Sequence, residues 1–309
     1  MNGLKEFVKR AMRLPANLIV GSSTNLQFRV EDVLKDAAAS VLIEEPAMAA
    51  KFLPYLGGKR DYILYPTTEF ATTGNKELPI PPKDVWQGYA ASPELFLEGA
   101  RNDTKAMRDI LDQSDFPIQA GYRILDLGCG AGRMIRMFVD IAETCEIWGV
   151  DITSEYIIWC QQHLSPPFHF ATTTTFPHLP FEDRYFDFIY CGSVFTHIAD
   201  LADAWLLELR RVTRPNGRIY ITLHDNNTIK MLREQAKRWP ILSELVQEFV
   251  RKTDLTGRKF SMFAMNRGPN SAQVFYDIDY VRQHWGRLFR ILSVTPGAYS
   301  YQTGVLLER

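Results

Sequence analysis

An apolar run that ends in a glycine-rich turn constrains the fold of this chain more than any other feature. Residues 124–133 are Ile-Leu-Asp-Leu-Gly-Cys-Gly-Ala-Gly-Arg. Glycine adopts positive φ without steric cost and lets the backbone approach a ligand closely. We therefore expect a buried β-strand, followed by a turn that opens a helix whose first N–H groups are free to bind a ligand.

From residue 123 onward, short apolar runs alternate with amphipathic stretches such as 134–142 and 201–212. This alternation is typical of βαβ units around a mainly parallel sheet. It predicts a doubly wound, Rossmann-like α/β fold, with a seven-stranded sheet and helices on both faces. The expected strands are Arg123–Leu127, Glu146–Asp151, Pro167–Thr172, Phe186–Cys191, Ile219–Leu223, Phe289–Val294 and Thr303–Leu307.

The chain also contains segments outside this pattern. Residues 1–118 are less regular, and we interpret them as a partly helical N-terminal extension that covers the ligand site. The main domain is predicted to span 119–309, with a cap inserted at 226–275, after the fifth strand. Aromatic and Met side chains of this insertion either line a substrate pocket or form the core of a small cap: Phe260, Met262, Phe263, Met265, Phe275 and Tyr276.

Charge and composition exclude several classes of protein. The 35 Lys and Arg residues against 36 Asp and Glu residues give a net charge of -1, so nucleic acid is not an expected partner. The four cysteines form no CxxC pair, which favours reduced thiols in a cytoplasmic protein.

No apolar run is long enough to span a membrane. Basic and apolar residues alternate within residues 1–13, as in a solvated helix or, alternatively, a helix on a membrane surface.

Two carboxylates at strand ends narrow the choice of ligand. Asp126 precedes the first glycine by two residues, and Asp151 ends the next strand, 23 residues after Gly128. That separation is close to the one that places an acid on the hydroxyls of a ribose. A dinucleotide site needs a third glycine where this chain has Arg133, and Asp126 would repel a pyrophosphate but accept hydrogen bonds from an ammonium group. S-adenosylmethionine (SAM) therefore fits better than NAD. Alternatively, the two acids bind no ligand and are solvated side chains at strand ends.

Residues 120–224 resemble the class I SAM-dependent methyltransferases. The resemblance is carried by Asp126–Gly132, by Val150-Asp151-Ile152, by 179–191 and by Pro215-Asn216-Gly217. It implies a SAM site built from these residues: Asp126, Gly128, Cys129 and Gly130 at the methionine end, Asp151 on the ribose, Ile152 and Thr173 at the adenine, and Cys191 in the loop after the fourth strand. The segment 193–197 and the strand at Gln302 are similar to bacterial methyltransferases of surface polysaccharide and natural-product pathways.

The catalytic candidates are two histidines. His224 follows the fifth strand, at the carboxyl edge where open α/β sheets bind ligands, and we expect it to act as a general base with a pKa near 6 to 7. Alternatively, it is a neutral histidine that caps a loop. His197 reaches the same edge and serves as the base or as a packed, hydrogen-bonded side chain. Asp225 offers a carboxylate to His224 or to a metal, but no second acid lies nearby in sequence, so we expect no metal site. Cys191 is interpreted as a small buried hydrophobe rather than a nucleophile.

These observations predict a SAM-dependent methyltransferase that O-methylates a small molecule or a saccharide. Methylation of base amino groups is not expected, because Cys191-Gly192-Ser193-Val194 lacks the Asn/Asp-Pro-Pro-aromatic motif of those enzymes. Two alternatives stay open. One is a nicotinamide-dependent oxidoreductase, and the other is a SAM-binding scaffold without catalytic activity.

Overall fold

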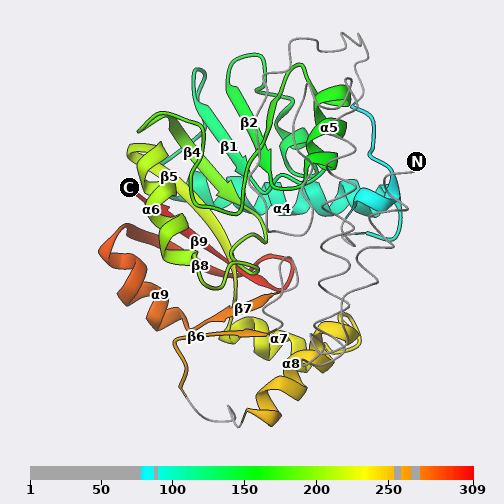
Figure 1. The fold of residues 1–309 in the computed structure, drawn as a ribbon, viewed down its shortest axis with the longest axis vertical. Helices are drawn as coiled ribbons and strands as arrows, with labels where there is room; N and C mark the ends of the chain where they lie inside the picture. Colours follow the sequence, from blue (N-terminus) through cyan, green and yellow to red (C-terminus); the bar gives the residue numbers. More distant parts are fainter. Residues whose placement is uncertain (1–77, 87–89, 254–258, 266–271) are drawn as a thin grey trace, which may run out of the picture.

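A computed structural model describes residues 78–86, 90–253, 259–265 and 272–309 of the chain (Figure 1). Its centre is a mixed sheet with the continuous strand order β3-β2-β1-β4-β5-β9-β8, in which β1 to β5 are parallel and β9 is antiparallel to both of its neighbours. The strands are β1 (Arg123–Leu127), β2 (Glu146–Asp151), β3 (His169–Thr172), β4 (Phe186–Cys191), β5 (Thr213–Asp225), β6 (Met262–Met265), β7 (Gln273–Tyr276), β8 (Arg290–Tyr299) and β9 (Gln302–Glu308). The helices are α4 (Pro93–Gln113), α5 (Ser154–His163), α6 (Ala202–Val212), α7 (Asn226–Glu234), α8 (Pro240–Lys252) and α9 (Ile278–His284), with 3₁₀ turns η2 (Lys83–Val85), η3 (Ile135–Phe138) and η4 (Trp285–Arg287).

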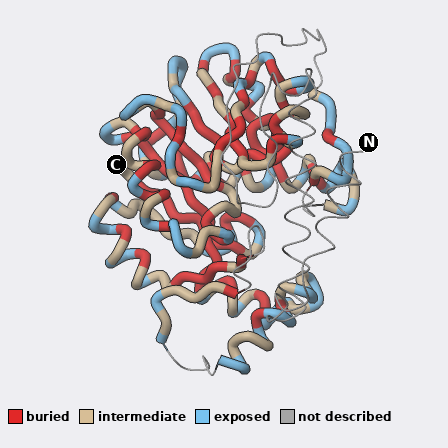
Figure 2. The backbone as a smooth tube through the Cα atoms, in the orientation of Figure 1, coloured by how far each residue is buried: buried red, intermediate tan, exposed pale blue. Residues whose placement is uncertain are grey.

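Both faces of the sheet are buried, as the apolar runs require. Successive residues of β4 pack into different cores: Phe188 and Tyr190 lie against α4 and α5, whereas Ile189 lies against α6 and η4. A strand covered on both faces has no polar side, which is why these runs are mostly apolar, with Asp126 and Asp187 as buried exceptions. Figure 2 shows the buried residues concentrated along the central strands. The doubly wound α/β fold predicted from the sequence is therefore confirmed.

The described part of the chain has nine strands where seven were expected. The two additional strands, β6 and β7, come from the inserted segment. They form an antiparallel pair, and β7 extends the end of β5 through the register pairs His224 with Phe275 and Asp225 with Tyr276. Together with α7 and α8 they form a cap with its own apolar cluster, which includes Leu232, Val246 and Phe275. The aromatic residues of the insertion thus belong mainly to the core of this cap.

The helix expected at 134–142 is not present. In its place the chain forms η3 and a series of turns, in which Met137 N–H donates to Met134 O and Ile141 N–H to Phe138 O. Gly128, Gly130 and Gly132 all have positive φ, so no right-handed helical turn can begin before Arg133. The i to i+3 bonds that follow are those of a 3₁₀ arrangement, not of an α-helix.

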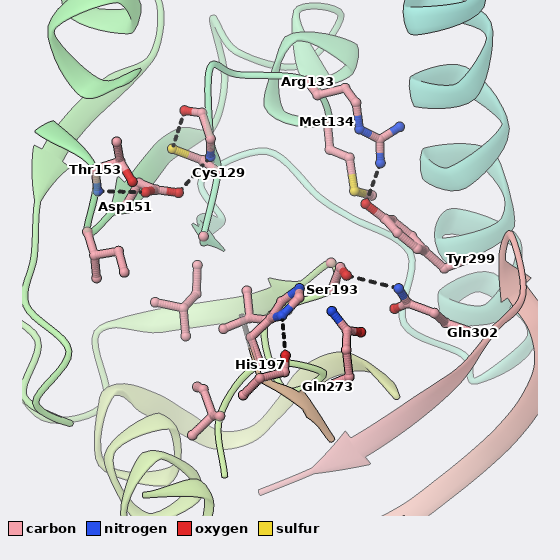
Figure 3. Close-up of a pocket in the computed structure, with 18 of the residues that line it drawn as sticks. Cys129, Arg133, Met134, Asp151, Thr153, Ser193, His197, Gln273, Tyr299 and Gln302 are labelled. Carbon is pink, nitrogen blue, oxygen red and sulfur yellow. Dashed lines mark hydrogen bonds between the residues drawn. The ribbon is translucent and has the colours of Figure 1, made fainter. Parts of the chain in front are cut away.

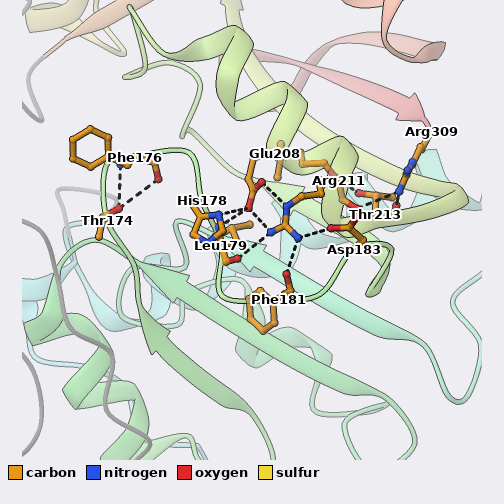
Figure 4. Close-up of polar contacts among 11 residues, drawn as sticks. Thr174, Phe176, His178, Leu179, Phe181, Asp183, Glu208, Arg211, Thr213 and Arg309 are labelled. Carbon is orange, nitrogen blue, oxygen red and sulfur yellow. Dashed lines mark hydrogen bonds and ion pairs between the residues drawn. The ribbon is translucent and has the colours of Figure 1, made fainter.

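Arg211, at the end of α6, fixes the loop between β3 and β4 (Figure 4). Its guanidinium donates to the carbonyls of Leu179 and Phe181 at 3.0 and 2.8 Å, to Asp183 at 2.8 Å and to both oxygens of Glu208. Glu208 in turn accepts from Leu179 N–H. The pKa of Arg211 is raised by its bond to Glu208, which keeps the charge in place. The loop that follows Thr173 is therefore held by charge-assisted hydrogen bonds.

The N-terminal predictions fall mostly outside the described residues. Residues 1–13, expected to form a solvated or membrane-surface helix, and most of the proposed extension 1–118 are in this category. Within the described part, α4 packs on the sheet through Met107, Ile110 and Leu111. None of the helices described has both the length and the apolar character that crossing a bilayer requires.

Candidate functional site

A cavity of about 1380 Å³ lies at the carboxyl ends of the parallel strands. Its wall includes the ends of β1, β2 and β5, the loops after β3 and β4, the turn between β8 and β9, and side chains of α8. Open α/β sheets bind ligands at this edge. Of the ten site residues expected from the sequence, nine line the cavity: Asp126, Gly128, Cys129, Gly130, Asp151, Ile152, Thr173, His197 and His224.

Cys191 is the exception. Its side chain is fully buried in the core beneath α6, and burial raises the pKa of its thiol well above the ordinary value. The next residue, Gly192, lies on the cavity wall instead. Side chains of adjacent residues in a strand point to opposite faces of the sheet. A site assignment that is one residue off therefore selects a side chain that lies in the core. The thiol of Cys191 is therefore part of the packing and not of the site.

The glycine turn is closed by its own hydrogen bonds. The N–H groups of Gly128 and Cys129 both donate to Val150 O, at 2.8 and 3.1 Å. A Cβ atom on Gly128 would lie 2.4 Å from a methyl carbon of Val194, so only glycine allows this turn to approach the loop after β4. Gly128 and Cys129 therefore offer no free N–H to a ligand, because both donate to the carbonyl of Val150.

Asp151 organises the same turn. One carboxylate oxygen accepts from Gly130 N–H at 2.9 Å, and the other accepts from Thr153 N–H at 2.8 Å (Figure 3). Burial raises the pKa of this carboxyl, while the backbone donors oppose the rise. Each carboxylate oxygen has a further lone pair available for a ligand hydroxyl. The side chain thus links the end of β2 to the glycine turn by a hydrogen bond, and it also lines the cavity.

Asp126 is a buried acid with an unused oxygen. The residue is 2% exposed, and its Oδ2 accepts no hydrogen bond from the described residues. Burial raises its pKa to about 7, against the opposing effects of Tyr190 and Arg133. An unsatisfied oxygen on a buried carboxylate is costly, so a cationic group bound beside it would favour the ionised form.

Arg133 also lines the cavity, next to the turn, and was not identified as a site residue from the sequence. Its guanidinium pairs with Asp103 of α4 at 2.8 Å and donates to the hydroxyl of Tyr299. These partners are 30 and 166 residues away in the sequence, so no local pattern reveals the contact. Because Asp103 balances the charge of Arg133, this ion pair adds little net charge at this end of the cavity.

His224 differs from its expected character. It is 1% exposed, it packs against Phe275 and Tyr301, and neither ring nitrogen has a hydrogen-bond partner among the described residues. Burial, with a smaller contribution from His197, lowers its pKa to about 3. The expected pKa near 6 to 7 is therefore corrected: the ring is neutral at pH 7 and is a weak base. Its neighbour Asp225 caps α7 by accepting from Thr228 N–H at 2.9 Å.

His197 has the geometry that a general base needs. Its Nδ1 lies 2.7 Å from Ala272 O, and a carbonyl can only accept, so Nδ1 carries the hydrogen. In the neutral ring, Nε2 is then an acceptor. The ring is exposed to the cavity, and the surrounding protein lowers its pKa below the ordinary value while the bond to Ala272 opposes this. Across the described residues, no cluster of three or more His, Cys, Asp or Glu side chains is suited to a metal ion.

Comparisons with known proteins agree with this site. Residues 125–221, about a third of the chain, match the family described as "Methyltransferase domain". The match covers the strands that build the glycine turn and confirms the methyltransferase domain expected from the resemblance.

Two curated relatives and one solved structure illustrate the similarity. An uncharacterized methyltransferase of Bacillus subtilis is 30% identical over 140 residues, covering 44% of this chain and 50% of the relative. A ubiquinone/menaquinone biosynthesis C-methyltransferase of Burkholderia cenocepacia is 29% identical over 108 residues, covering 34% and 44%. The chain thus spans half or less of the length of these relatives. A crystal structure of magnesium protoporphyrin IX methyltransferase from Synechocystis aligns with a TM-score of 0.47 and 15% identity, over 71% of this chain and 89% of that one.

Proposed function

We propose that this protein transfers a methyl group from SAM to the hydroxyl group of a small acceptor bound in the same cavity. The observation that carries the proposal is the arrangement of Asp126 and Asp151 around the glycine turn, at adjacent strand ends. One acid has an unused oxygen and the other holds the turn while facing the cavity. The match to the methyltransferase family supports it over the same residues.

The residues present fit SAM. Asp126, with its unbonded Oδ2 and raised pKa, suits the ammonium of the methionine moiety. Asp151 suits the ribose hydroxyls, and Ile152 and Thr173 line the wall where the adenine would follow. When bound, SAM supplies a methyl carbon on a cationic sulfur, and the acceptor's lone pair forms the new bond as the carbon–sulfur electron pair returns to sulfur.

The protein's own contribution to this reaction is orientation and proton removal. We assign the general base to His197, because its Nδ1–H is fixed by Ala272 and its Nε2 faces the cavity. As the acceptor oxygen forms its new bond, its proton passes to Nε2 of His197. His224, with a pKa near 3, is better suited to accept a hydrogen bond than to carry a proton.

A carbon acceptor is a second candidate, because the Burkholderia relative is named a C-methyltransferase. A nicotinamide-dependent oxidoreductase is less well supported, since Arg133 replaces the third glycine and the buried Asp126 would repel a pyrophosphate. A SAM-binding scaffold does not explain why an oriented histidine faces the cavity.

The test uses SAM carrying a radiolabelled methyl group, with catechol and methyl α-D-glucopyranoside as acceptors. His197→Ala should lower kcat by about 10² to 10⁴ while leaving the SAM affinity within twofold. His163→Ala, an exposed histidine on α5 outside the cavity wall, is the matched control. In the wild type at saturating SAM, kcat/KM for the acceptor should rise with pH through a midpoint below the ordinary histidine pKa of 6.5, because the pKa of His197 is lowered. Full kcat in His197→Ala would contradict the assignment.

A further inference from the structure

We propose that the carboxamides of Gln302 and Gln273 form the acceptor site, and that this site takes a neutral molecule carrying two neighbouring oxygen atoms. One oxygen is the hydroxyl that receives the methyl group, bound between Gln302 and His197. The other is bound by Gln273. This inference rests on the proposed function and adds the chemical class of the acceptor.

Gln302 is fixed by a buried hydrogen-bond network between β5, β9 and the loop after β4. Its Oε1 accepts from Thr222 Oγ1 at 2.6 Å, and its Nε2 donates to Ser193 Oγ at 2.9 Å (Figure 3). Thr222 Oγ1 also accepts from Ser193 N–H at 2.7 Å. Gln302 is 4% exposed and Thr222 is fully buried, yet Gln302 lies on the cavity wall.

The hydrogen positions in this network follow from its geometry. Thr196 Oγ1 donates to the Ser193 carbonyl at 2.9 Å, so its own hydrogen is used. Ser193 Oγ, 3.0 Å away, must therefore donate to Thr196 Oγ1, and it can then accept only from an N–H of Gln302. A carboxamide nitrogen has two hydrogens, and the second N–H of Gln302 has no partner among the described residues. Because Gln302 lines the cavity, this donor is available to a bound acceptor.

The same network also positions the base. Ser193 has a φ of 60°, in the left-handed region, and the loop that it begins continues through the bond from His197 N–H to Val194 O at 2.9 Å. Such a conformation persists only where surrounding contacts impose it, and Thr196, Thr222 and Gln302 supply those contacts. Nε2 of His197, an acceptor, and Nε2 of Gln302, a donor, are therefore fixed by one network. Together they match a hydroxyl, which both donates and accepts.

Gln273 provides the second contact. It lies at the start of β7, directly after the Ala272 carbonyl that orients His197, and it lines the cavity. Figure 3 shows its carboxamide in the space between His197 and Gln302. The amide has no hydrogen bond to the described residues. A free carboxamide can donate to one oxygen and accept from another, which suits an oxygen beside the reacting hydroxyl. The two unpaired nitrogens of His224, on the same wall, also favour a polar acceptor.

The charge of the cavity wall restricts the acceptor further. Arg133 is the one Lys or Arg side chain that the described wall contains, and it is already paired with Asp103 and Tyr299 at the turn. Phosphate and carboxylate groups are usually bound by cationic side chains. The acceptor site thus offers neutral donors and acceptors, which match hydroxyl and carbonyl groups rather than anions.

The test measures binding to the full chain loaded with S-adenosylhomocysteine (SAH), by calorimetry. The probes are catechol, methyl α-D-glucopyranoside and phenyl phosphate. We expect catechol or the glucoside to bind, and phenyl phosphate to bind more weakly than the neutral probe that binds. Gln302→Leu and Gln273→Leu should each weaken the probe that binds by about 3- to 10-fold, the effect of losing one hydrogen bond, with SAH affinity unchanged within twofold.

Two further variants separate acceptor binding from folding. Thr222→Val keeps the shape of the side chain, lies outside the cavity wall and releases Gln302, so it should weaken the same probe. Gln161→Leu removes a carboxamide that bonds to Phe170 O away from the cavity, and it should leave probe binding unchanged. Melting temperatures establish that each variant is folded.

The outcomes are distinct. Preference for catechol or for the glucoside identifies an aromatic or a sugar source of the paired oxygens. The inference is overturned if neither neutral probe binds the SAH-loaded protein, if phenyl phosphate binds more tightly, or if the glutamine variants bind the probe like the wild type. Failure of SAH itself to bind would instead overturn the proposed function, and this inference with it.

Discussion

Replacing His224 with Phe should remove a large part of the protein's sensitivity to acid. The imidazole is 1% exposed between Phe275 and Tyr301, and both of its nitrogens lack partners among the described residues. Phenylalanine keeps an aromatic ring in this apolar setting and removes two unsatisfied polar atoms. At pH 7.5 we expect the unfolding free energy of His224→Phe to match the wild type within about 1 kcal/mol.

The magnitude follows from the pKa of His224. Burial lowers it from 6.5 to about 3 in the folded protein, so the unfolded chain binds a proton over this interval and the folded protein does not. The contribution of His224 to stability is complete above pH 6.5 and is lost as the pH falls toward 3. Each pH unit in this interval costs about 1.4 kcal/mol, so the loss between pH 6.5 and 4.5 is about 3 kcal/mol.

Urea unfolding of wild type and His224→Phe at pH 7.5, 6.5, 5.5 and 4.5 measures this directly. Other groups titrate in both proteins, so the difference between the two isolates His224. The variant should become more stable than the wild type as the pH falls, by about 3 kcal/mol at pH 4.5. A difference that stays constant across the series would refute the reasoning, because it would mean that the imidazole is protonated as easily in the folded protein as in the unfolded chain.

Three further predictions concern the cofactor site and the cap. Because burial raises the pKa of Asp126 to about 7 and an ammonium favours its ionised form, SAH affinity should fall about tenfold between pH 8 and pH 6, and Asp126→Asn should abolish this dependence in calorimetry. Asp151→Ala should weaken SAH binding by about 1.5 to 3 kcal/mol and lower the melting temperature, because Gly130 N–H loses its acceptor; affinity within twofold of wild type would place the ribose elsewhere. Replacing residues 230–270 with a short linker should abolish methylation of the acceptor while SAH still binds, since the glycine turn is held between β1 and β2 and not by the cap. Loss of both methylation and SAH binding would mean that the cap is part of the cofactor site.

The sequence predicted the parallel part of the fold well, for a physical reason. β1, β2 and β4 begin and end at the residues expected, because strands buried on both faces are short and mostly apolar. The helix expected at 134–142 is wrong: the chain forms the 3₁₀ turn η3 and further i to i+3 turns there. The sequence did not give the bounds of β6 and β7, since these short aromatic runs are strands through pairing: β7 pairs with the end of β5, and β6 pairs with β7.

The candidate site was predictable where its residues are close in sequence. Asp126, the glycine turn and Asp151 follow from local pattern. The contacts of Gln302 with Ser193 span 109 residues and depend on which strands are neighbours in the sheet, so no sequence pattern reveals them. Both histidines line the cavity as expected, but the sequence does not show their surroundings: Ala272 orients His197, while His224 is enclosed by aromatic rings.

The central claim is that the glycine turn with Asp126 and Asp151 binds SAM. Calorimetric titration of the full chain with SAH and, separately, with NAD tests it most directly. The account predicts saturable, one-to-one binding of SAH and no heat from NAD, because the turn lacks the third glycine and carries a buried acid where a pyrophosphate would lie. Binding of NAD without binding of SAH would contradict the account.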